Sequence, residues 1–191
     1  KTFAAVGNRK IWTYSVWVKR GKIDSDLYFL LAANPSFGIR YENNLLLINL
    51  RGDSTNYFID FVNTYRDSSA WYHLVFACDT TQATSTNRFK AYVNGVQLTT
   101  NSSYNSYPPQ NYDTGCNTAA AHYIGRNGFS DSYPFDGYMS EAYFIDGQAL
   151  TPSSFGATDK DGNWSPIAYT GTYGTNGFYL NFKDVTSAAT T

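Results

Sequence analysis

Few side chains in this 191-residue sequence could work as a paired acid and base. It contains two glutamates, Glu42 and Glu141. Cleavage of a glycosidic bond with retention needs two carboxyl groups about 5–5.5 Å apart. Glu141 is followed by Ala142 and Tyr143, and Asp146, five residues on, has the opposite side-chain parity on a strand. The paired-carboxylate pattern is therefore missing, and we expect Glu141 to be a structural residue and the protein not to be an enzyme.

The histidines and cysteines form no catalytic or metal-binding pattern either. His122 has no partner visible in the sequence, and Cys78 and Cys116 lack the C-x-x-C spacing of metal or redox sites. Two buried thiols are the simpler interpretation of the cysteines. A disulfide between them is the alternative, in an oxidising compartment. No phosphate-binding loop or nucleophile elbow is present.

Aromatic residues dominate instead, with 17 Tyr, 13 Phe and 4 Trp, while only 15% of the chain is charged. Flat rings stack on the C–H faces of sugars, and amide side chains bond the hydroxyls. Two long stretches, 101–121 and 158–176, show no pattern of regular structure, and such loops are often functional. Their rings are our candidate ligand-binding residues: Tyr104, Tyr107, Tyr112, Trp164, Tyr169 and Tyr173. The alternative is that these rings only pack the loops onto the protein.

A third candidate is a calcium site. Asp159, Asp161 and Asn163 offer the hard oxygen ligands that Ca²⁺ prefers. The run lacks the full D-x-[DN]-x-[DN]-G spacing and the distal glutamate of a calcium loop. An ordinary Asp-Gly turn is therefore the simpler interpretation, with Ca²⁺ as the alternative. The sequence requires no other cofactor.

Charge and hydropathy exclude several partners. Lys and Arg number 14 against 15 Asp and Glu, a formal net charge of −1. A nucleic-acid binder needs a basic surface, so we expect no nucleic-acid partner. No apolar run approaches the ~18 residues of a membrane span, and we expect no membrane insertion. The first ten residues lack the apolar core of a signal peptide, so the chain is either mature or a piece of a longer protein.

Short apolar segments separated by Gly, Asn, Asp, Ser and Pro predict an all-β protein, an antiparallel sandwich or barrel. The pair Asn94-Gly95 suits a type I′ hairpin turn. Thr151 and Pro152 suit the start of one short helical turn. The expected strands are 12–19, 27–32, 38–41, 45–49, 57–61, 71–79, 88–93, 96–98, 122–124, 138–145 and 178–182.

The strand expected at 71–79 is apolar on both faces, which predicts a cover on each side. One face carries Leu74, Phe76 and Cys78, and the other carries His73, Val75 and Ala77. We assign Trp12, Trp17 and Trp71 to the sandwich itself.

The order of several motifs resembles a known family. WYHLV at 71–75 and RFKAYVNG at 88–95 resemble the W-x-H-x-V … K-x-Y-V-N-G signature of laminin-G-like jelly rolls, in the concanavalin A-like lectin/glucanase superfamily. YIGR at 123–126, FDGYMSEA at 135–142 and QALT at 148–151 resemble its later strands. The resemblance implies one antiparallel β-sandwich of jelly-roll type over residues 1–183, with 184–191 as a flexible tail or linker. It also implies a packing role for His73, and the Glu-x-Asp-x-(x)-Glu strand of the family's glycosidases is absent.

Three segments are closer to phage structural proteins that carry this module. They are TYSVWVKR at 13–20, FIDGQALTPSSF at 144–155 and AYTGTYGTNGF at 168–178. The resemblance implies an extracellular or virion-surface module of a phage tail or fibre. Such a module would recognise cell-surface glycan through its rim loops and would assemble with other subunits, as a homo-oligomer. A purely architectural subunit and a glycan depolymerase are the two alternatives.

Overall fold

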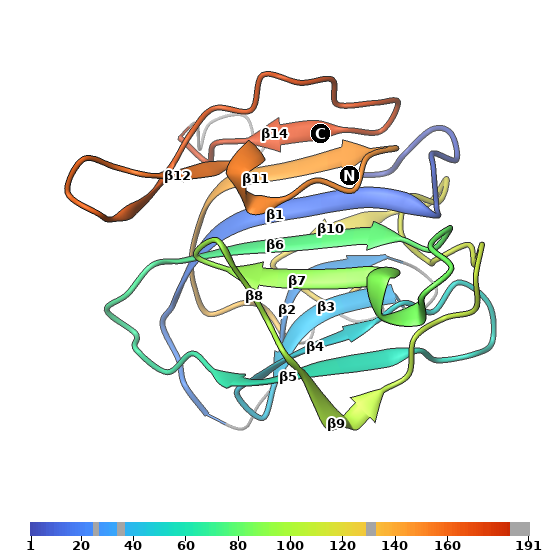
Figure 1. Ribbon diagram of the computed structural model, residues 1–191, viewed down its shortest axis with the longest axis horizontal. Helices are drawn as coiled ribbons and strands as arrows, with labels where there is room; N and C mark the ends of the chain where they lie inside the picture. The colour runs from blue at the N-terminus through green and yellow to red at the C-terminus, as the bar shows by residue number, and fades with distance from the viewer. Residues whose placement is uncertain (25–26, 34–36, 129–132, 184–191) are drawn as a thin grey trace.

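Two antiparallel sheets pack face to face in the computed structural model, which describes residues 1–24, 27–33, 37–128 and 133–183 (Figure 1). The first sheet has the strand order β14-β11-β1-β6-β7-β8, and the second β10-β2-β3-β4-β5-β9. A small third sheet pairs β12 with β13. The strands are β1 (Ile11–Arg20), β2 (Leu27–Ala33), β3 (Phe37–Glu42), β4 (Leu45–Asn49), β5 (Phe58–Thr64), β6 (Tyr72–Asp79), β7 (Phe89–Val93), β8 (Val96–Gln97), β9 (Thr100–Asn105), β10 (His122–Ile124), β11 (Gly137–Asp146), β12 (Gly156–Thr158), β13 (Trp164–Pro166) and β14 (Phe178–Leu180). The predicted all-β jelly-roll sandwich is confirmed.

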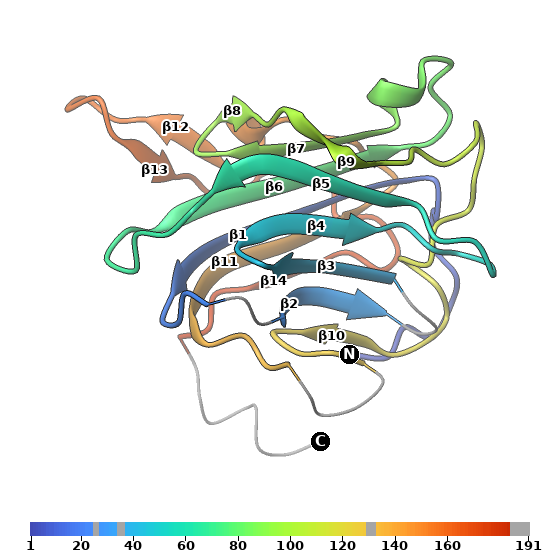
Figure 2. The same cartoon turned by 90° about the horizontal axis from the view of Figure 1, so that it is seen from below.

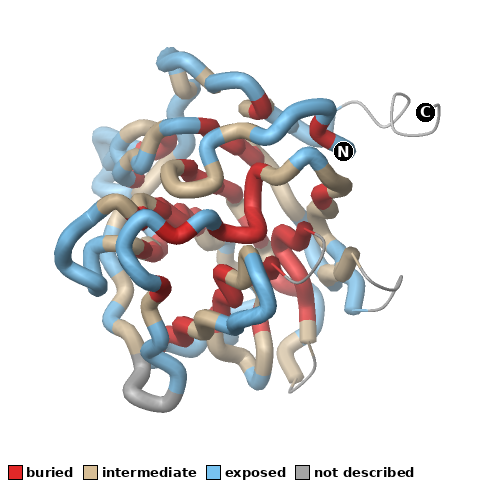
Figure 3. Tube along the Cα trace, turned by 90° about the vertical axis from the view of Figure 1, so that its right-hand side faces the viewer, coloured by how far each residue is buried: buried red, intermediate tan, exposed pale blue. Residues whose placement is uncertain are grey.

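The side chains of β6 alternate between two faces of the first sheet, and both faces are buried, as the sequence predicted. Leu74, Phe76 and Cys78 lie in the main core between the sheets, and all three are fully buried. His73 and Val75, on the other face, are equally buried, because a further layer covers the outside of the first sheet. Figure 3 shows the buried segments along the middle of the strands and the exposed ones in the loops.

The covering layer comes from the C-terminal third of the chain. Val75, Tyr143, Ile145 and Phe155 form a second buried cluster on the outer face of the first sheet. Leu150, Tyr169 and Tyr173 pack against this cluster and are partly exposed. The segment after β11 therefore acts as a partial third layer, and the projecting β12–β13 hairpin interrupts it between Phe155 and Tyr169 (Figure 2).

Both predicted turns are present. Asn94 and Gly95 have φ of 48° and 85°, the left-handed pair that a type I′ turn requires. A short 3-10 helix, η2 (Pro152–Ser154), follows Thr151, whose side chain does not cap it. The other helix of the described residues is η1 (Ser85–Asn87). No helix in the described part of the chain is long and apolar enough to cross a membrane.

Three sequence expectations are corrected or fall outside the structure. The stretch 101–121 does not begin as a loop, because Thr100–Asn105 forms β9 beside β5. Its Ser- and Asn-rich sequence has low β-propensity, so the pairing partner decides the conformation. The second stretch contains β13, which was not expected either. The expected tail, 184–191, lies outside the described residues.

Both cysteines are buried free thiols, as the simpler interpretation held. Burial raises the pKa of Cys78 and of Cys116 well above the ordinary thiol value. Neither thiol is therefore an activated nucleophile.

A buried carboxylate ties distant parts of the chain together at the end of β11. Asp146 Oδ1 accepts hydrogen bonds from the Asn8 backbone N–H at 2.8 Å and from Asn117 Nδ2 at 2.7 Å. Its Oδ2 accepts one from the backbone N–H of Asn176 at 3.1 Å, and Asn176 Nδ2 in turn donates to the Ala5 carbonyl. Asp146 thus joins the N-terminal segment, the loop before β10 and the segment before β14.

Candidate functional site: a pocket lined by tryptophan

Three tryptophans line a pocket on the outer face of the first sheet. Its volume is about 320 Å³, and its lining includes all three residues of β13. The β12–β13 hairpin projects from one end of the sandwich (Figure 1). Trp71 is the most exposed of the three rings, with 42% of its surface accessible, whereas Trp17 and Trp164 are half-buried. The full lining is Trp17, Trp71, Ser140, Glu141, Trp164, Ser165 and Pro166.

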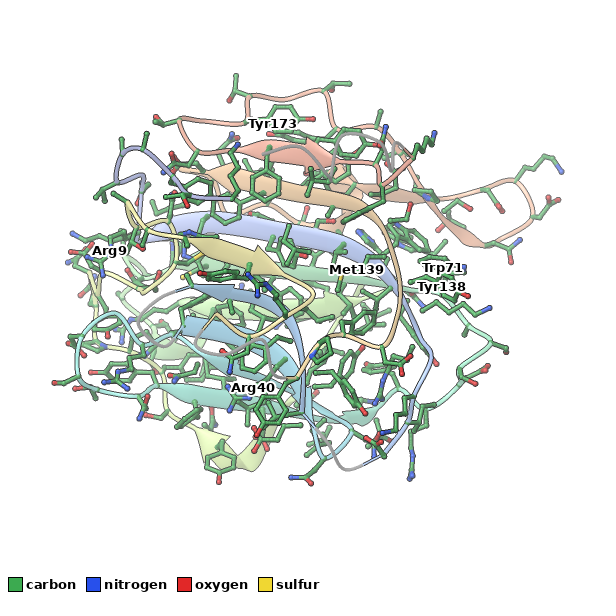
Figure 4. All side chains as sticks on the ribbon, turned by 180° about the vertical axis from the view of Figure 1, so that it is seen from behind. Arg9, Arg40, Trp71, Tyr138, Met139 and Tyr173 are labelled. Carbon is green, nitrogen blue, oxygen red and sulfur yellow. The ribbon has the colours of Figure 1, made fainter. Side chains whose placement is uncertain are left out.

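Strand register explains why residues far apart in sequence meet here. Trp17 on β1 pairs with His73 on β6 and with Ser140 on β11, so the three form one row across the sheet. Trp71 precedes His73 by two positions and therefore faces the same side. In Figure 4 Trp71 and Tyr138 lie at the same end of the molecule, the end where the hairpin projects.

A β-bulge turns two consecutive residues of β11 toward the pocket. The register of β1 against β11 shifts between Ser15 and Trp17, and Glu141 has a φ of 50°. Left-handed backbone is unfavourable for a glutamate and persists only where the surroundings hold it. Bulges commonly re-aim side chains beside functional sites. Here the bulge brings Ser140 and Glu141 together in the pocket wall.

Glu141 is the one charged residue among the described residues that line the pocket. Its Oε2 accepts hydrogen bonds from the hydroxyls of Tyr179 at 2.6 Å and Tyr143 at 3.3 Å. Partial burial, followed by the hydrogen bond to Glu141, raises the pKa of Tyr179, so this phenol remains a donor. No described residue donates to Oε1, which leaves that oxygen able to accept a bond from a ligand.

His73 forms the floor behind the pocket. Trp164 Nε1 donates to His73 Nδ1 at 2.9 Å, so Nδ1 is the unprotonated nitrogen and Nε2–H is left to bond Ser15 Oγ at 2.8 Å. The Trp17 ring stacks on the imidazole with centroids 5.0 Å apart. Burial lowers the pKa of His73 to about 4. These contacts with Trp164, Ser15 and Trp17 give His73 the packing role that the family resemblance implied.

The two neutral histidines give a testable pH dependence. His122 is also buried, accepts the Asn117 N–H at 3.0 Å through Nε2, and has a pKa lowered by burial to about 4. The unfolded chain takes up protons near pH 6.5 and the folded chain only near pH 4, so folding is weakened as the pH falls through this window. Between pH 6.5 and 5 we expect the free energy of unfolding to fall by roughly 1.5 kcal/mol for each of His73 and His122. Urea unfolding at the two pH values measures it, and a flat profile would contradict the buried neutral state.

The three tyrosines of the first predicted loop lie away from the pocket. Tyr104 is an exposed residue of β9, and Tyr107 packs against the main core. Tyr112 is only 9% exposed, and its hydroxyl accepts the N–H of Gly52 and donates to Asp53 Oδ1. The ring and hydroxyl of Tyr112 are engaged in fixing this loop, as the packing alternative describes, and ligand binding by Tyr104, Tyr107 or Tyr112 stays a prediction.

Of the three candidate rings in the second predicted stretch, two pack on the covering layer and one lines the pocket. Tyr169 and Tyr173 pack on the covering layer, with ring centroids 5.5 Å apart, and the Tyr169 hydroxyl donates to the Thr172 carbonyl. Trp164, by contrast, lines the pocket. Its indole lies against Gly156, where a Cβ atom would collide with it, and against Gly95, where a Cβ atom would come within 3.0 Å of it. The hairpin glycines therefore fix the position of this ring.

The candidate calcium residues form an exposed turn at the tip of the β12–β13 hairpin. Asp159 Oδ1 accepts the backbone N–H groups of Asp161 and Asn163, each at 2.9 Å, and Oδ2 accepts the Ser165 hydroxyl. These bonds, with that from the Asn163 N–H first, lower the pKa of Asp159. The described residues contain no group of three or more His, Cys, Asp or Glu placed for a metal ion. The contacts are those of an Asx turn, and calcium binding here stays a prediction.

Trp12, Trp17 and Trp71 were assigned to the sandwich from the sequence, without a face being given to any of them. Trp12 is in the core as expected, but Trp17 and Trp71 lie on the outer face. The available signal was parity, since Trp17 alternates with Trp12 and shares a face with Ser15. The position of Trp164 above them could not be read from parity.

The described geometry is that of a lectin-like β-sandwich with a preformed aromatic pocket. The chain belongs to the concanavalin A-like lectin/glucanases superfamily, whose family model matches residues 2–156. No curated protein matches it in sequence.

Several solved structures share the fold at low sequence identity. The native SAP-like pentraxin of Limulus polyphemus matches with a TM-score of 0.56 and 17% identity, over 95% of this chain and 83% of the pentraxin. The CBM40 of the Ruminococcus gnavus IT-sialidase matches with a TM-score of 0.54 and 16% identity, over 76% and 80%. Domain 4 of AbnA, an extracellular arabinanase of Geobacillus stearothermophilus solved with arabinotriose, matches with 0.52 and 24%, over 75% of this chain and 64% of that chain.

Proposed function

We propose that this chain is a non-enzymatic glycan-binding module and that the tryptophan-lined pocket is its binding site. The observation that carries the proposal is the exposed Trp71 ring beside Glu141, Ser140 and Ser165 in a preformed hollow. Sugar sites combine a flat apolar ring with a few fixed polar groups, and this pocket supplies both.

The comparisons support binding rather than catalysis. The Ruminococcus gnavus CBM40 was also solved with α2,3-sialyllactose, and the arabinanase domain with arabinotriose. Retaining glycosidases need a second carboxyl group about 5–5.5 Å away. The pocket lining of this chain holds a single carboxylate, Glu141.

The setting we propose is an extracellular appendage, a phage tail or fibre, in which the domain is present in many copies. The phage-like segments at 13–20, 144–155 and 168–178 support this setting. A shallow, open pocket gives weak binding to a single sugar chain, and several linked copies can raise avidity by about 10²–10⁴. Cell-surface glycan is the ligand of such an assembly, and other subunits of the appendage are its partners.

A glycan array probed with a folded, multimerised form of the chain tests this function. We expect binding to a restricted set of glycans and no release of new reducing ends from them. Binding should be strongly weakened with Trp71→Ala and kept with Tyr104→Ala, because Tyr104 is at least as exposed as Trp71 but belongs to the other sheet. An array without any binding would contradict the proposal and favour a purely architectural subunit. Release of reducing ends would contradict the non-enzymatic assignment.

A further inference from the structure

We infer that the pocket takes the positively charged ammonium group of an amino sugar and discriminates against acidic sugars. The inference rests on the proposed glycan-binding function and names the class of glycan. It is carried by the charge, the partners and the surroundings of Glu141.

Glu141 is a carboxylate without a neighbouring cation in the pocket. Its hydrogen-bond partners are two tyrosine hydroxyls, both on Oε2, and none of the described lining residues is Lys or Arg. A partly buried carboxylate binds an oppositely charged group through strong charge-assisted hydrogen bonds, and none of the described lining residues supplies such a group. The free Oε1 therefore favours a ligand that brings a cation.

The cation on the same outer face of β1 lies outside the pocket. Lys19 is two residues beyond Trp17 on this strand, pairs in register with Tyr138, and is not among the described lining residues. Its charge contributes a small part of the lowering of the pKa of Asp67, after the hydrogen bonds from Ser69.

The tryptophan rings add a second attraction for an ammonium group. Trp is the aromatic residue that binds cations best through its ring face, and the interaction strengthens when water is excluded. Trp17, Trp71 and Trp164 all line the same hollow as Glu141. The pocket consequently combines tryptophan rings and one carboxylate, the two kinds of group that bind an ammonium group.

The same features disfavour an acidic sugar. A carboxylated sugar in the pocket would bring its negative charge near Glu141 with no Arg or Lys in the lining to bind it. The site chemistry therefore differs from that needed for sialyllactose, the acidic ligand with which the Ruminococcus gnavus module was solved. The shared fold does not carry over the ligand.

Three trisaccharides of matched size test the inference by calorimetric titration at pH 6 and low salt: glucosamine, N-acetylglucosamine and galacturonate. We expect the glucosamine trisaccharide to bind about tenfold more tightly than its N-acetylated form, and the galacturonate trisaccharide to bind most weakly. Glu141→Gln should remove this preference, since the amide keeps the shape and loses the charge. Glu42→Gln should retain it, because Glu42 is on the other sheet and pairs with Arg40.

The outcomes separate this inference from the proposed function. If no saccharide on the array or in the titrations binds, the glycan-binding function itself fails. If sugars bind but the galacturonate form is equal or preferred, the charge assignment is overturned. It is also overturned if Glu141→Gln keeps the preference for glucosamine. Circular dichroism of both variants confirms that they are folded.

Discussion

Replacing Trp71 with alanine is expected to weaken glycan binding by about 30-fold, a loss of ~2 kcal/mol, because tryptophan anchors carry most of the energy at binding sites. Trp71 is 42% exposed and comes just before β6, so its ring contributes more to the pocket than to the core. The stability of the variant should stay within ~1 kcal/mol of the parent. Titration of a multimerised form with an array-selected glycan, together with thermal unfolding, measures both quantities.

A matched control makes this result specific to the pocket. Tyr104→Ala removes a ring that is 52% exposed and lies on β9 of the second sheet. We expect this variant to bind like the parent. Equal losses in the two variants, or a loss confined to Tyr104→Ala, would place the binding surface elsewhere.

Replacing Asp146 with alanine is expected to lower the free energy of unfolding by about 3–5 kcal/mol, since removal leaves three donors, two of them buried, without their acceptor. Those donors are the N–H groups of Asn8 and Asn176 and Nδ2 of Asn117. They come from three segments that the carboxylate holds together. Urea unfolding of the parent and the variant at pH 7 measures the difference.

Asp146→Asn separates the charge from the hydrogen bonds. The amide keeps one oxygen acceptor and loses the other. We therefore expect the free energy of unfolding of Asp146→Asn to lie between that of the parent and that of Asp146→Ala. A change below ~1 kcal/mol in Asp146→Ala would contradict the assignment of Asp146 as the connecting residue.

The fold could be predicted because short sequence patterns specify its strands and turns. Alternation with a period of two places Leu74, Phe76 and Cys78 on one face of β6, and the structure buries that face between the sheets. Asn94-Gly95 specifies its own turn through left-handed backbone. The order of the motifs along the chain, together with these local patterns, indicated the family.

The site could be predicted only in part, because the residues that line the pocket come from segments far apart in the sequence. Trp164 was among the candidate rings, but its partners in the pocket come from β1, from β11 and from Trp71, just before β6. The bulge at Glu141 depends on the register of two long strands, and no residue type in the sequence marks it. Parity could have placed Trp17 and Trp71 on the outer face, whereas the contact of Trp164 with His73 depends on how the hairpin folds back.

The tyrosines of the first predicted loop show that a residue type can suggest ligand binding where the side chain anchors a loop. Tyr112 has the composition of a sugar-binding residue, yet its hydroxyl satisfies the backbone of Gly52 and its ring packs edge-on against Tyr57. A tyrosine in a long loop must first anchor that loop, because irregular backbone leaves polar groups to satisfy. The ring type alone therefore does not distinguish anchoring from binding.

The most direct test of the glycan-binding pocket is an NMR titration that follows the four tryptophan indole N–H signals while an array-selected glycan is added. Trp12 is an internal control, since it is fully buried in the core and donates Nε1 to Thr114 Oγ1 at 3.0 Å. We predict that the signals of Trp17, Trp71 and Trp164 shift in a saturable way while that of Trp12 stays unchanged. Binding that leaves all three pocket signals in place would contradict the assignment of this pocket as the site.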